Sequence, residues 1–464
     1  MVSNKVKLQH LFLRAGFGES PARIKSLESN SIDSVVDSLF TDSAISKDLD
    51  YISDPLHGRD DEEISSAKIV LLILKSRKQL MELNLKWLDQ MSSTKAVLRE
   101  KMTFFWHNHF ATSAPFGYPM QNQNNMFRKN ALGKFSDLLK LVAKDPSMII
   151  YLNNQQNTKD APNENFAREV MELFTLGEGH YTEKDIKEAA RAFTGWKVDK
   201  TGRYEFNDRK HDFGEKEFFG QKGNFNGEEI LSIILKEKQT ASFIVKKIWR
   251  EFVSEVEDQN LISTLADQFY QSDYSIADLL KTIYKSDWFY DEKYIGCKIS
   301  SPTELLVRYK RLIHAKFKTD KTVFDIQKVL GQMLFFPPNV AGWKGGKNWI
   351  DSASLTLRLN LANVIIKGEG LNIKPKPEFE DMMEIMPAKS TYNDIEYDFS
   401  QVIEPFKNQK DILLTEVILD SFIQCKKDKI NKNLLMPSGT GITETDKIST
   451  IIMNLMLLPE FQLI

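Results

Sequence analysis

The stretch that decides the fold class is residues 230–284, which read ILSIILKEKQTASFIVKKIWREFVSEVEDQNLISTLADQFYQSDYSIADLLKTIY. Apolar side chains recur here at spacings of three and four, which is the period of a helix buried along one face. Short polar segments interrupt the pattern, so it predicts helices over 230–235, 241–252, 261–270 and 276–284. Consecutive helices joined by short loops pack against one another, and the stretch therefore predicts a helical layer.

The same spacing extends outward from about Leu8 to Val364, while alternation of period two is rare. The sequence thus predicts a mainly α fold, in which residues 1–366 form one large multi-helix domain. Its other helices are predicted over 32–40, 69–85, 98–105, 127–142, 165–176, 184–193, 304–313 and 355–364.

One excursion, over residues 197–225, departs from the helical pattern. Thr201-Gly202 separates two short candidate strands, and several glycines follow them. These signals predict a β-hairpin that leads into an irregular loop. A second irregular stretch, 335–354, contains Pro337-Pro338 and two tryptophans, so we expect a packed loop.

After the main domain the composition shifts to Pro, Lys, Glu, Asp and Met without a clear period. This shift predicts a linker or irregular insertion over 367–401. Helical spacing returns at 411–425 and 447–457, within a C-terminal segment, 402–464, that we expect to pack on the main domain.

The composition excludes several functional classes. The 464 residues contain 62 Lys and Arg against 64 Asp and Glu, a net charge of −2, which argues against nucleic-acid binding as the main function. Cys297 and Cys425 are the only cysteines, which excludes a disulfide framework and a thiolate zinc site. We expect no transmembrane segment and no export signal, so the default location is the cytoplasm.

The densest group of chemically capable residues is FWHNHF, residues 105–110. On a continuous helix, positions two apart diverge by about 200°, so His107 and His109 could not bind one ion. In a strand or a terminal turn they could converge. Hydrogen-bonded core histidines and ligands or proton carriers remain equal alternatives.

A second group is NENFAREVMELFT, residues 163–175. Asn165, Glu169 and Glu172 share one face of the predicted helix, and Glu164 and Arg168 form an i, i+4 pair beside it. Two carboxylates one turn apart could bind a hard cation or transfer protons. The alternative is a solvated or salt-bridged face.

A third group follows the helix over 184–193. Gly195 is predicted to cap that helix in the left-handed conformation, and Trp196 is predicted to be a packing anchor. His211 and Asp212 are adjacent on the irregular excursion, with Lys216 nearby, and loops often carry functional residues. No common nucleotide-binding, hydrolase or zinc-protease motif is present.

Several long segments in this order resemble the bacterial family called domain of unknown function 1800. They include HLFLRAGFG (10–18), KMTFFWHNHFATS (101–113), the segments NENFAREVMELFTLG, RAFTGW and HDFGEKEFFG, and a region from Phe336 to Asn363. Lys344 replaces a common Pro, and the loop over 176–181 is short. The family's polar signature falls on His10, Arg14, His107, Asn108, His109, Asn163, Glu164, Asn165, Arg168, Glu169, Glu172, Arg191, Trp196, His211, Asp212, Asn339, Trp343 and Trp349.

The resemblance also implies a partner. Members are often encoded beside a protein of the domain of unknown function 1501 family, which is similar to phosphatases and sulfatases and carries a twin-arginine signal. The leading hypothesis is therefore an enzyme that works with this partner. Its divalent metal ion would be bound by His107, His109, Glu169 and Glu172, with Arg168 or Arg191 holding an anionic group and His211 and Asp212 contributing to catalysis.

The alternative hypothesis is a non-catalytic helical partner protein. In that case the polar motifs form a buried structural network or an interface. Co-export with a signal-bearing partner would place such a protein in the periplasm.

Overall fold

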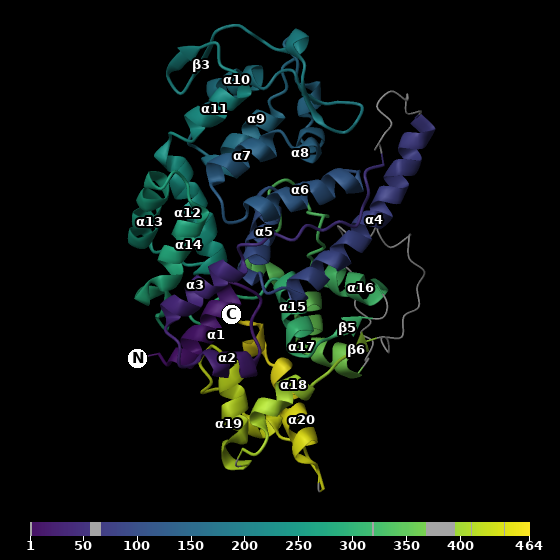
Figure 1. The fold of residues 1–464 in the computed structure, drawn as a ribbon, viewed down its shortest axis with the longest axis vertical. Coiled ribbons are helices and arrows are strands. Elements are labelled where there is room, and N and C mark those ends of the chain that lie inside the picture. Colours follow the sequence, from purple (N-terminus) through teal and green to yellow (C-terminus); the bar gives the residue numbers. More distant parts are fainter. Residues whose placement is uncertain (1, 56–65, 318–319, 368–394, 410, 440) are drawn as a thin grey trace.

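The computed structural model describes residues 2–55, 66–317, 320–367, 395–409, 411–439 and 441–464. Helices dominate these residues, which confirms the predicted mainly α fold (Figure 1). The helices are α1 (Asn4–Arg14), α2 (Pro21–Leu27), α3 (Ile32–Asp42), α4 (Ser66–Ser93), α5 (Val97–His109), α6 (Gly117–Asn130), α7 (Phe135–Ala143), α8 (Pro146–Tyr151), α9 (Asn165–Glu169), α10 (Glu183–Ala192), α11 (Gly227–Ile234), α12 (Lys238–Phe252), α13 (Gln259–Gln271), α14 (Ile276–Lys285), α15 (Pro302–Leu312), α16 (Asp320–Leu330), α17 (Ser352–Lys367), α18 (Ser400–Ile403), α19 (Asp411–Phe422) and α20 (Glu444–Met456).

The strands form small antiparallel sheets of two strands each. They are β1 (Trp196–Val198) with β2 (Tyr204–Phe206), β3 (Lys216–Phe218) with β4 (Gln221–Gly223), and β5 (Lys316–Phe317) with β6 (Ile395–Glu396).

The four helices predicted from residues 230–284 are present as α11 to α14, each ending within three residues of its predicted bounds. Polar caps set their starts: Asn226 and Glu229 form a capping box at α11, and Asp258 and Ser275 cap α13 and α14. Their apolar faces lie in the largest core cluster. Local sequence and tertiary packing therefore agree in this layer.

The predicted helix over 127–142 is wrong, because the chain breaks between α6 and α7. The backbone N–H of Phe135 donates to the carbonyl of Tyr274 at 2.9 Å, and that of Ile276 donates to Gly133 at 3.0 Å. These bonds to a segment about 140 residues away replace helical bonds. The break therefore has a tertiary cause that local spacing does not report.

The C-terminal segment shares a core with the helices before it. Leu305, Leu361, Ile418 and Ile452 are fully buried in one cluster that joins α15 and α17 to α19 and α20. In Figure 1 helices α18 to α20 form the narrow end of the molecule, opposite the end that carries β3. Most of the predicted linker over 367–401 lies outside the described residues, and the domain boundaries remain a prediction.

The excursion contains the predicted hairpin. Strands β1 and β2 pair with Lys197 opposite Glu205, and Gly202 lies in the turn with a φ of 79°. Gly195 has a φ of 83°, and a Cβ there would lie 2.5 Å from the carbonyl oxygen of Asn207, so only glycine fits. Trp196 is buried against Phe193, which confirms its role as a packing anchor.

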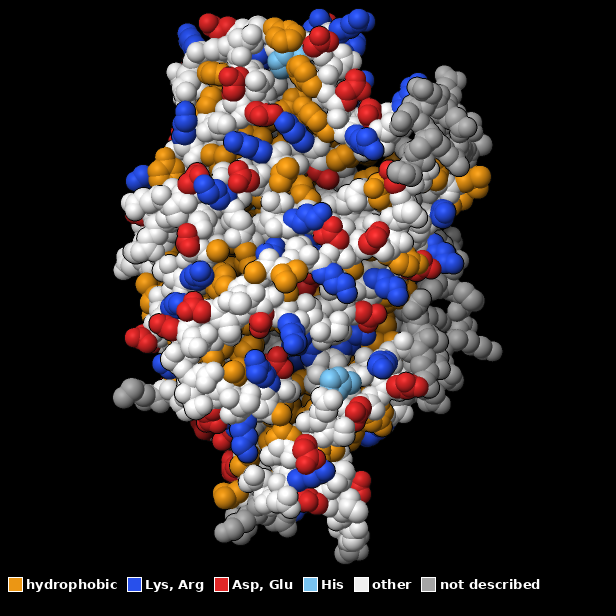
Figure 2. Space-filling view, viewed as in Figure 1, with side chains coloured by type: hydrophobic (Ala, Val, Ile, Leu, Met, Phe, Trp, Pro, Cys, Tyr) orange, Lys and Arg blue, Asp and Glu red, His pale blue; other side chains and the backbone are white. Residues whose placement is uncertain are grey.

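No helix in the described ranges combines the length and apolar character required to cross a membrane. Figure 2 shows positive and negative side chains interspersed over the visible face rather than gathered by sign.

Candidate functional site

The two histidines of FWHNHF lie in the last turn of α5, and both are buried. His107 Nε2 accepts a hydrogen bond from the backbone N–H of Phe335 at 3.1 Å. Its ring packs against the rings of Trp87 and Trp343, with centroid distances of 5.0 and 5.7 Å. Burial lowers the pKa of His107 to about 3, so this imidazole is neutral.

His109 has a different set of neighbours. Its Nε2 lies 3.1 Å from the carbonyl oxygen of Phe174 and must donate to it, because a carbonyl only accepts. Burial, with a smaller contribution from Lys247, lowers the pKa of His109 well below its ordinary value. Its Nδ1 has no hydrogen-bond partner within the described part of the chain.

The histidines therefore diverge, as positions two apart on a continuous helix must. The segments FWHNHF and NENFAREVMELFT (163–175) do meet, but the contact joins His109 to the backbone of Phe174 and not to a carboxylate. No group of three or more His, Cys, Asp or Glu among the residues described could hold a metal ion. The structure does not bring His107, His109, Glu169 and Glu172 together as one ligand set.

The helix that carries the carboxylates changes type after Glu169. Residues Val170–Thr175 form a π-helix, in which Leu176 N donates to Met171 O at 2.8 Å, five residues back. π-Helical turns are rare overall, but those that occur are often at functional sites. Glu172 accepts from the Tyr181 hydroxyl at 2.6 Å, whereas no hydrogen bond or ion pair to a described residue engages the carboxylate of Glu169. Burial and the neighbouring Glu172 raise the pKa of Glu169.

Arg168 contacts the start of α10 instead of a shared site. Its guanidinium donates to both carboxylate oxygens of Glu183, at 2.9 and 3.0 Å, and lies 3.4 Å from Glu164. The hydrogen bonds that Arg168 donates to Glu183 raise the pKa of Arg168. The predicted i, i+4 pair with Glu164 is present, but it is the longer of the two contacts.

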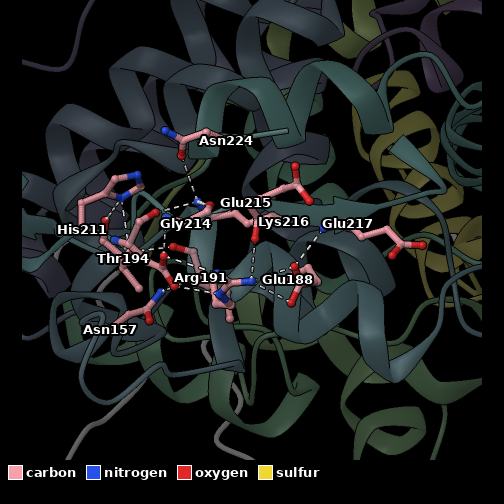
Figure 3. Close-up of polar contacts among 12 residues, drawn as sticks. Asn157, Glu188, Arg191, Thr194, His211, Gly214, Glu215, Lys216, Glu217 and Asn224 are labelled. Atoms are coloured by element: carbon pink, nitrogen blue, oxygen red, sulfur yellow. Dashed lines mark hydrogen bonds and ion pairs between the residues drawn. The ribbon is translucent and has the colours of Figure 1, made fainter. Parts of the chain in front are cut away.

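Arg191 is the centre of the network that Figure 3 shows. Its Nε donates to Asp212 at 2.7 Å, and its Nη1 donates to both oxygens of Glu188 at 3.0 and 2.9 Å. Glu188 also accepts from the backbone N–H of Glu217 at 2.9 Å. One arginine and two carboxylates thus attach the irregular excursion to α10.

His211 and Lys216 also belong to this network, but their side chains form no hydrogen bond with each other. His211 Nδ1 lies 2.8 Å from the carbonyl of Thr194, so it donates there, and burial lowers the pKa of His211. Lys216 Nζ donates to the carbonyls of Asp212 and Gly214 at 2.6 and 3.0 Å. The side chains of His211 and Asp212, adjacent in the sequence, bond to different residues, Thr194 and Arg191.

A buried ion pair between α5 and α6 was not predicted from the sequence. Glu100 and Arg128 have side chains that are 3% and 0% exposed, with 2.6 Å between Oε1 and Nε. Trp87 Nε1 donates to the same carboxylate at 2.8 Å. The available signal was Glu100 itself, a charge on the helix that also carries the aromatic run.

A second buried ionic cluster lies where α1, α5 and α12 approach residue 298. Lys101 pairs with Glu304 and lies 3.6 Å from Glu251, while Lys298 lies 4.0 Å from Glu251. Burial lowers the pKa of Lys101 to about 8 and that of Lys298 to about 7. Arg14 is buried beside them and donates to the Tyr294 carbonyl at 2.9 Å.

These observations define a mainly α-helical protein. Most of the polar side chains in its sequence motifs form hydrogen bonds or ion pairs with other residues of the same chain. The chain belongs to the family described as protein of unknown function DUF1800, whose model matches residues 10–463. The match therefore continues beyond Asn363, where the motifs visible in the sequence end, and it includes the C-terminal helices. No curated protein and no solved structure matches the chain.

Proposed function

We propose that this chain is a non-catalytic helical partner protein whose polar motifs form an internal network. The supporting observation is the engagement of these motifs by the chain itself: His107 bonds to Phe335, Asn108 Oδ1 accepts from Trp343 N at 2.8 Å, and Arg191 pairs with Asp212. A catalytic centre needs groups that converge on a substrate. These groups converge on one another or on backbone.

The partner that we propose is the neighbouring protein of the domain of unknown function 1501 family. This part of the proposal rests on the family's usual gene neighbourhood. Because that neighbour carries a twin-arginine signal, the pair would be exported together and act in the periplasm.

The test is co-expression of the full chain with the 1501-family protein, followed by purification through a tag on one of them. We expect a complex of fixed stoichiometry in size-exclusion chromatography. Asp212→Asn should lower the thermal stability of the chain but leave the stoichiometry unchanged. A chain that remains alone at micromolar concentrations would overturn the proposal, as would turnover by the isolated chain.

One observation favours an enzyme as the second candidate. Glu169 is half-buried, has a raised pKa, and directly precedes the π-helix that carries Glu172. A carboxyl group with these properties is suited to proton transfer. If this candidate is correct, the chain together with its 1501-family partner will turn over a phosphate or sulfate ester, and Glu169→Gln in this chain will lower kcat while Glu164→Gln will not. Equal activity in both variants would remove the candidate.

A further inference from the structure

A groove of about 640 Å³ lies beside the β1–β2 hairpin, between helices α4, α6 and α8. This volume is within the usual range of about 300–1,000 Å³ for ligand sites. None of the residues that line it belongs to the polar signature of the family. The groove is therefore separate from the network described above.

Apolar side chains form much of the groove surface. They come from the four elements around it and are only partly covered: Leu72, Phe116, Tyr118, Ile150, Val198 and Tyr204. On α4 the apolar surface continues outward at Leu71, which is 67% exposed and lies one turn before Lys75. Contiguous exposed apolar surface of this kind marks an interaction site.

The edge of the groove is basic. Lys75, Lys200 and Arg203 line it and are exposed. None of them forms an ion pair with a residue of the described ranges, whereas Lys197, on the same hairpin, pairs with Glu205 at 3.1 Å. Arg203 interacts electrostatically with Asp199 but forms no ion pair with it, and all three cations face solvent.

The acidic residues of the groove are engaged by the chain itself. Asp199 Oδ1 accepts from the backbone N–H and the hydroxyl of Thr201, both at 2.8 Å. Asp145 accepts from Gln123 at 2.7 Å, and burial raises its pKa to about 7, so near neutral pH it is only partly charged. Asp54 also has a partner. Asp199 and Asp54 keep their charges but are half-buried, and Asp145 is buried, whereas the three cations are exposed. The side chains that face solvent at the edge of the groove are therefore mainly positive.

We infer that this groove binds a short peptide segment of the partner protein that carries both apolar and acidic side chains. This inference rests on the proposed function, since it names the surface and the chemistry by which the partner is recognised. Apolar side chains would cover Leu72, Phe116 and Val198, and carboxylates would pair with Lys200 and Arg203. Binding by anchors in an apolar groove with charges at its edge is a common mode of peptide recognition.

The experiment is selection of a random heptapeptide display library on the full chain. Enriched peptides should contain apolar residues together with Asp or Glu. In fluorescence polarisation, a selected peptide should bind the Lys200→Glu/Arg203→Glu variant at least tenfold more weakly. The matched control is Lys429→Glu, a reversal of another exposed lysine, which should change the affinity by less than twofold.

The inference is overturned if no peptide is enriched, if basic peptides are enriched, or if a selected peptide binds both variants with equal affinity. A dimer of the chain that the double variant dissociates would assign the groove to a second copy and would also overturn it. The partner complex distinguishes the two proposals. If the complex forms equally well with the double variant, the groove inference fails and the proposed function stands. If no complex forms but acidic peptides bind, the proposed function fails instead.

Discussion

Replacing Glu100 with glutamine tests whether the buried polar network stabilises this fold. Four N–H donors converge on the Glu100 carboxylate: Trp87 Nε1 and Gln90 Nε2, both at 2.8 Å, and Arg128 Nε and Nη2 at 2.6 and 3.2 Å. A glutamine has one acceptor oxygen, and its NH₂ group would face donors. Arg128 would keep its bonds to Asn124 and Asn125 but lose its counter-ion.

The expected loss in the free energy of unfolding follows from this geometry. Removing one partner of a buried ion pair costs about 3–5 kcal/mol, because the remaining charge stays buried without compensation. Urea unfolding followed by circular dichroism would measure the loss. The matched control is Lys129→Gln, a change at the residue after Arg128. Lys129 forms an ion pair with Asp48 at 2.8 Å, but the two side chains are 60% and 36% exposed. That variant should lose less than about 1 kcal/mol.

A double variant separates the charge effect from the change in packing. Glu100→Leu with Arg128→Met removes both charges, so it should be less destabilised than Glu100→Leu alone. If Glu100→Gln loses no more than the Lys129 control, the reasoning is refuted. The same holds if the double variant shows only the sum of its two single effects.

Three other predictions concern single side chains. Burial raises the pKa of Asp145 from 3.8 to about 7, so between these values the native state binds a proton that the unfolded state has lost, and the free energy of unfolding should fall as the pH rises. Asp145→Asn, which keeps the cap of α8, should remove this pH dependence in urea titrations at several pH values. Asp212→Asn should lower the free energy of unfolding by about 1 kcal/mol and speed proteolysis within 197–225, and an unchanged cleavage rate would contradict this. Because Arg191 lowers the pKa of Asp212, the difference in stability between wild type and variant should disappear as the pH falls through that lowered pKa. His107→Leu should lower stability by roughly 1–3 kcal/mol in thermal unfolding, because the N–H of Phe335 loses its acceptor, and a neutral result would mean that the bond contributes nothing.

Local sequence signals predicted most of the helical layer, because residues close in sequence determine where a helix starts and which face of it is apolar. Thr182 and Asp185 form a capping box at the start of α10, and Gly177 and Gly195 have the positive φ values expected after helices. The failed helix over 127–142 has a non-local cause, because the break at Gly133 depends on bonds with residues 274 and 276.

The candidate site was predictable only in part. Helical geometry alone indicated that His107 and His109 diverge on a continuous helix. Their partners could not be predicted, because His107 bonds to a residue 228 positions away and His109 to a backbone carbonyl. Sequence patterns show which residues can ligate or transfer protons, but they do not show that a main-chain group already occupies those atoms.

The partners of α5 show what its polar side chains do in the fold. Lys101 pairs with Glu304, His107 accepts from Phe335, and Asn108 accepts from Trp343, so this helix is joined to the region 304–343 at three points along its length. Apolar contacts alone tolerate rotation and sliding of a helix, whereas a buried donor without its acceptor is costly. Such bonds select one register among many compact packings.

Substitutions in α5 and in the β1–β2 hairpin should have different effects. Changes at Lys101, His107 or Asn108 should lower stability in proportion to the bond removed, and should affect partner binding only through the loss of folded protein. Changes at Lys200 or Arg203, which are exposed in the hairpin, should lower partner binding at unchanged stability. The test is to measure both unfolding stability and partner binding for His107→Leu and for Arg203→Glu. If His107→Leu weakened binding without destabilising the chain, the distinction would be wrong, because a purely structural histidine affects binding only through folding.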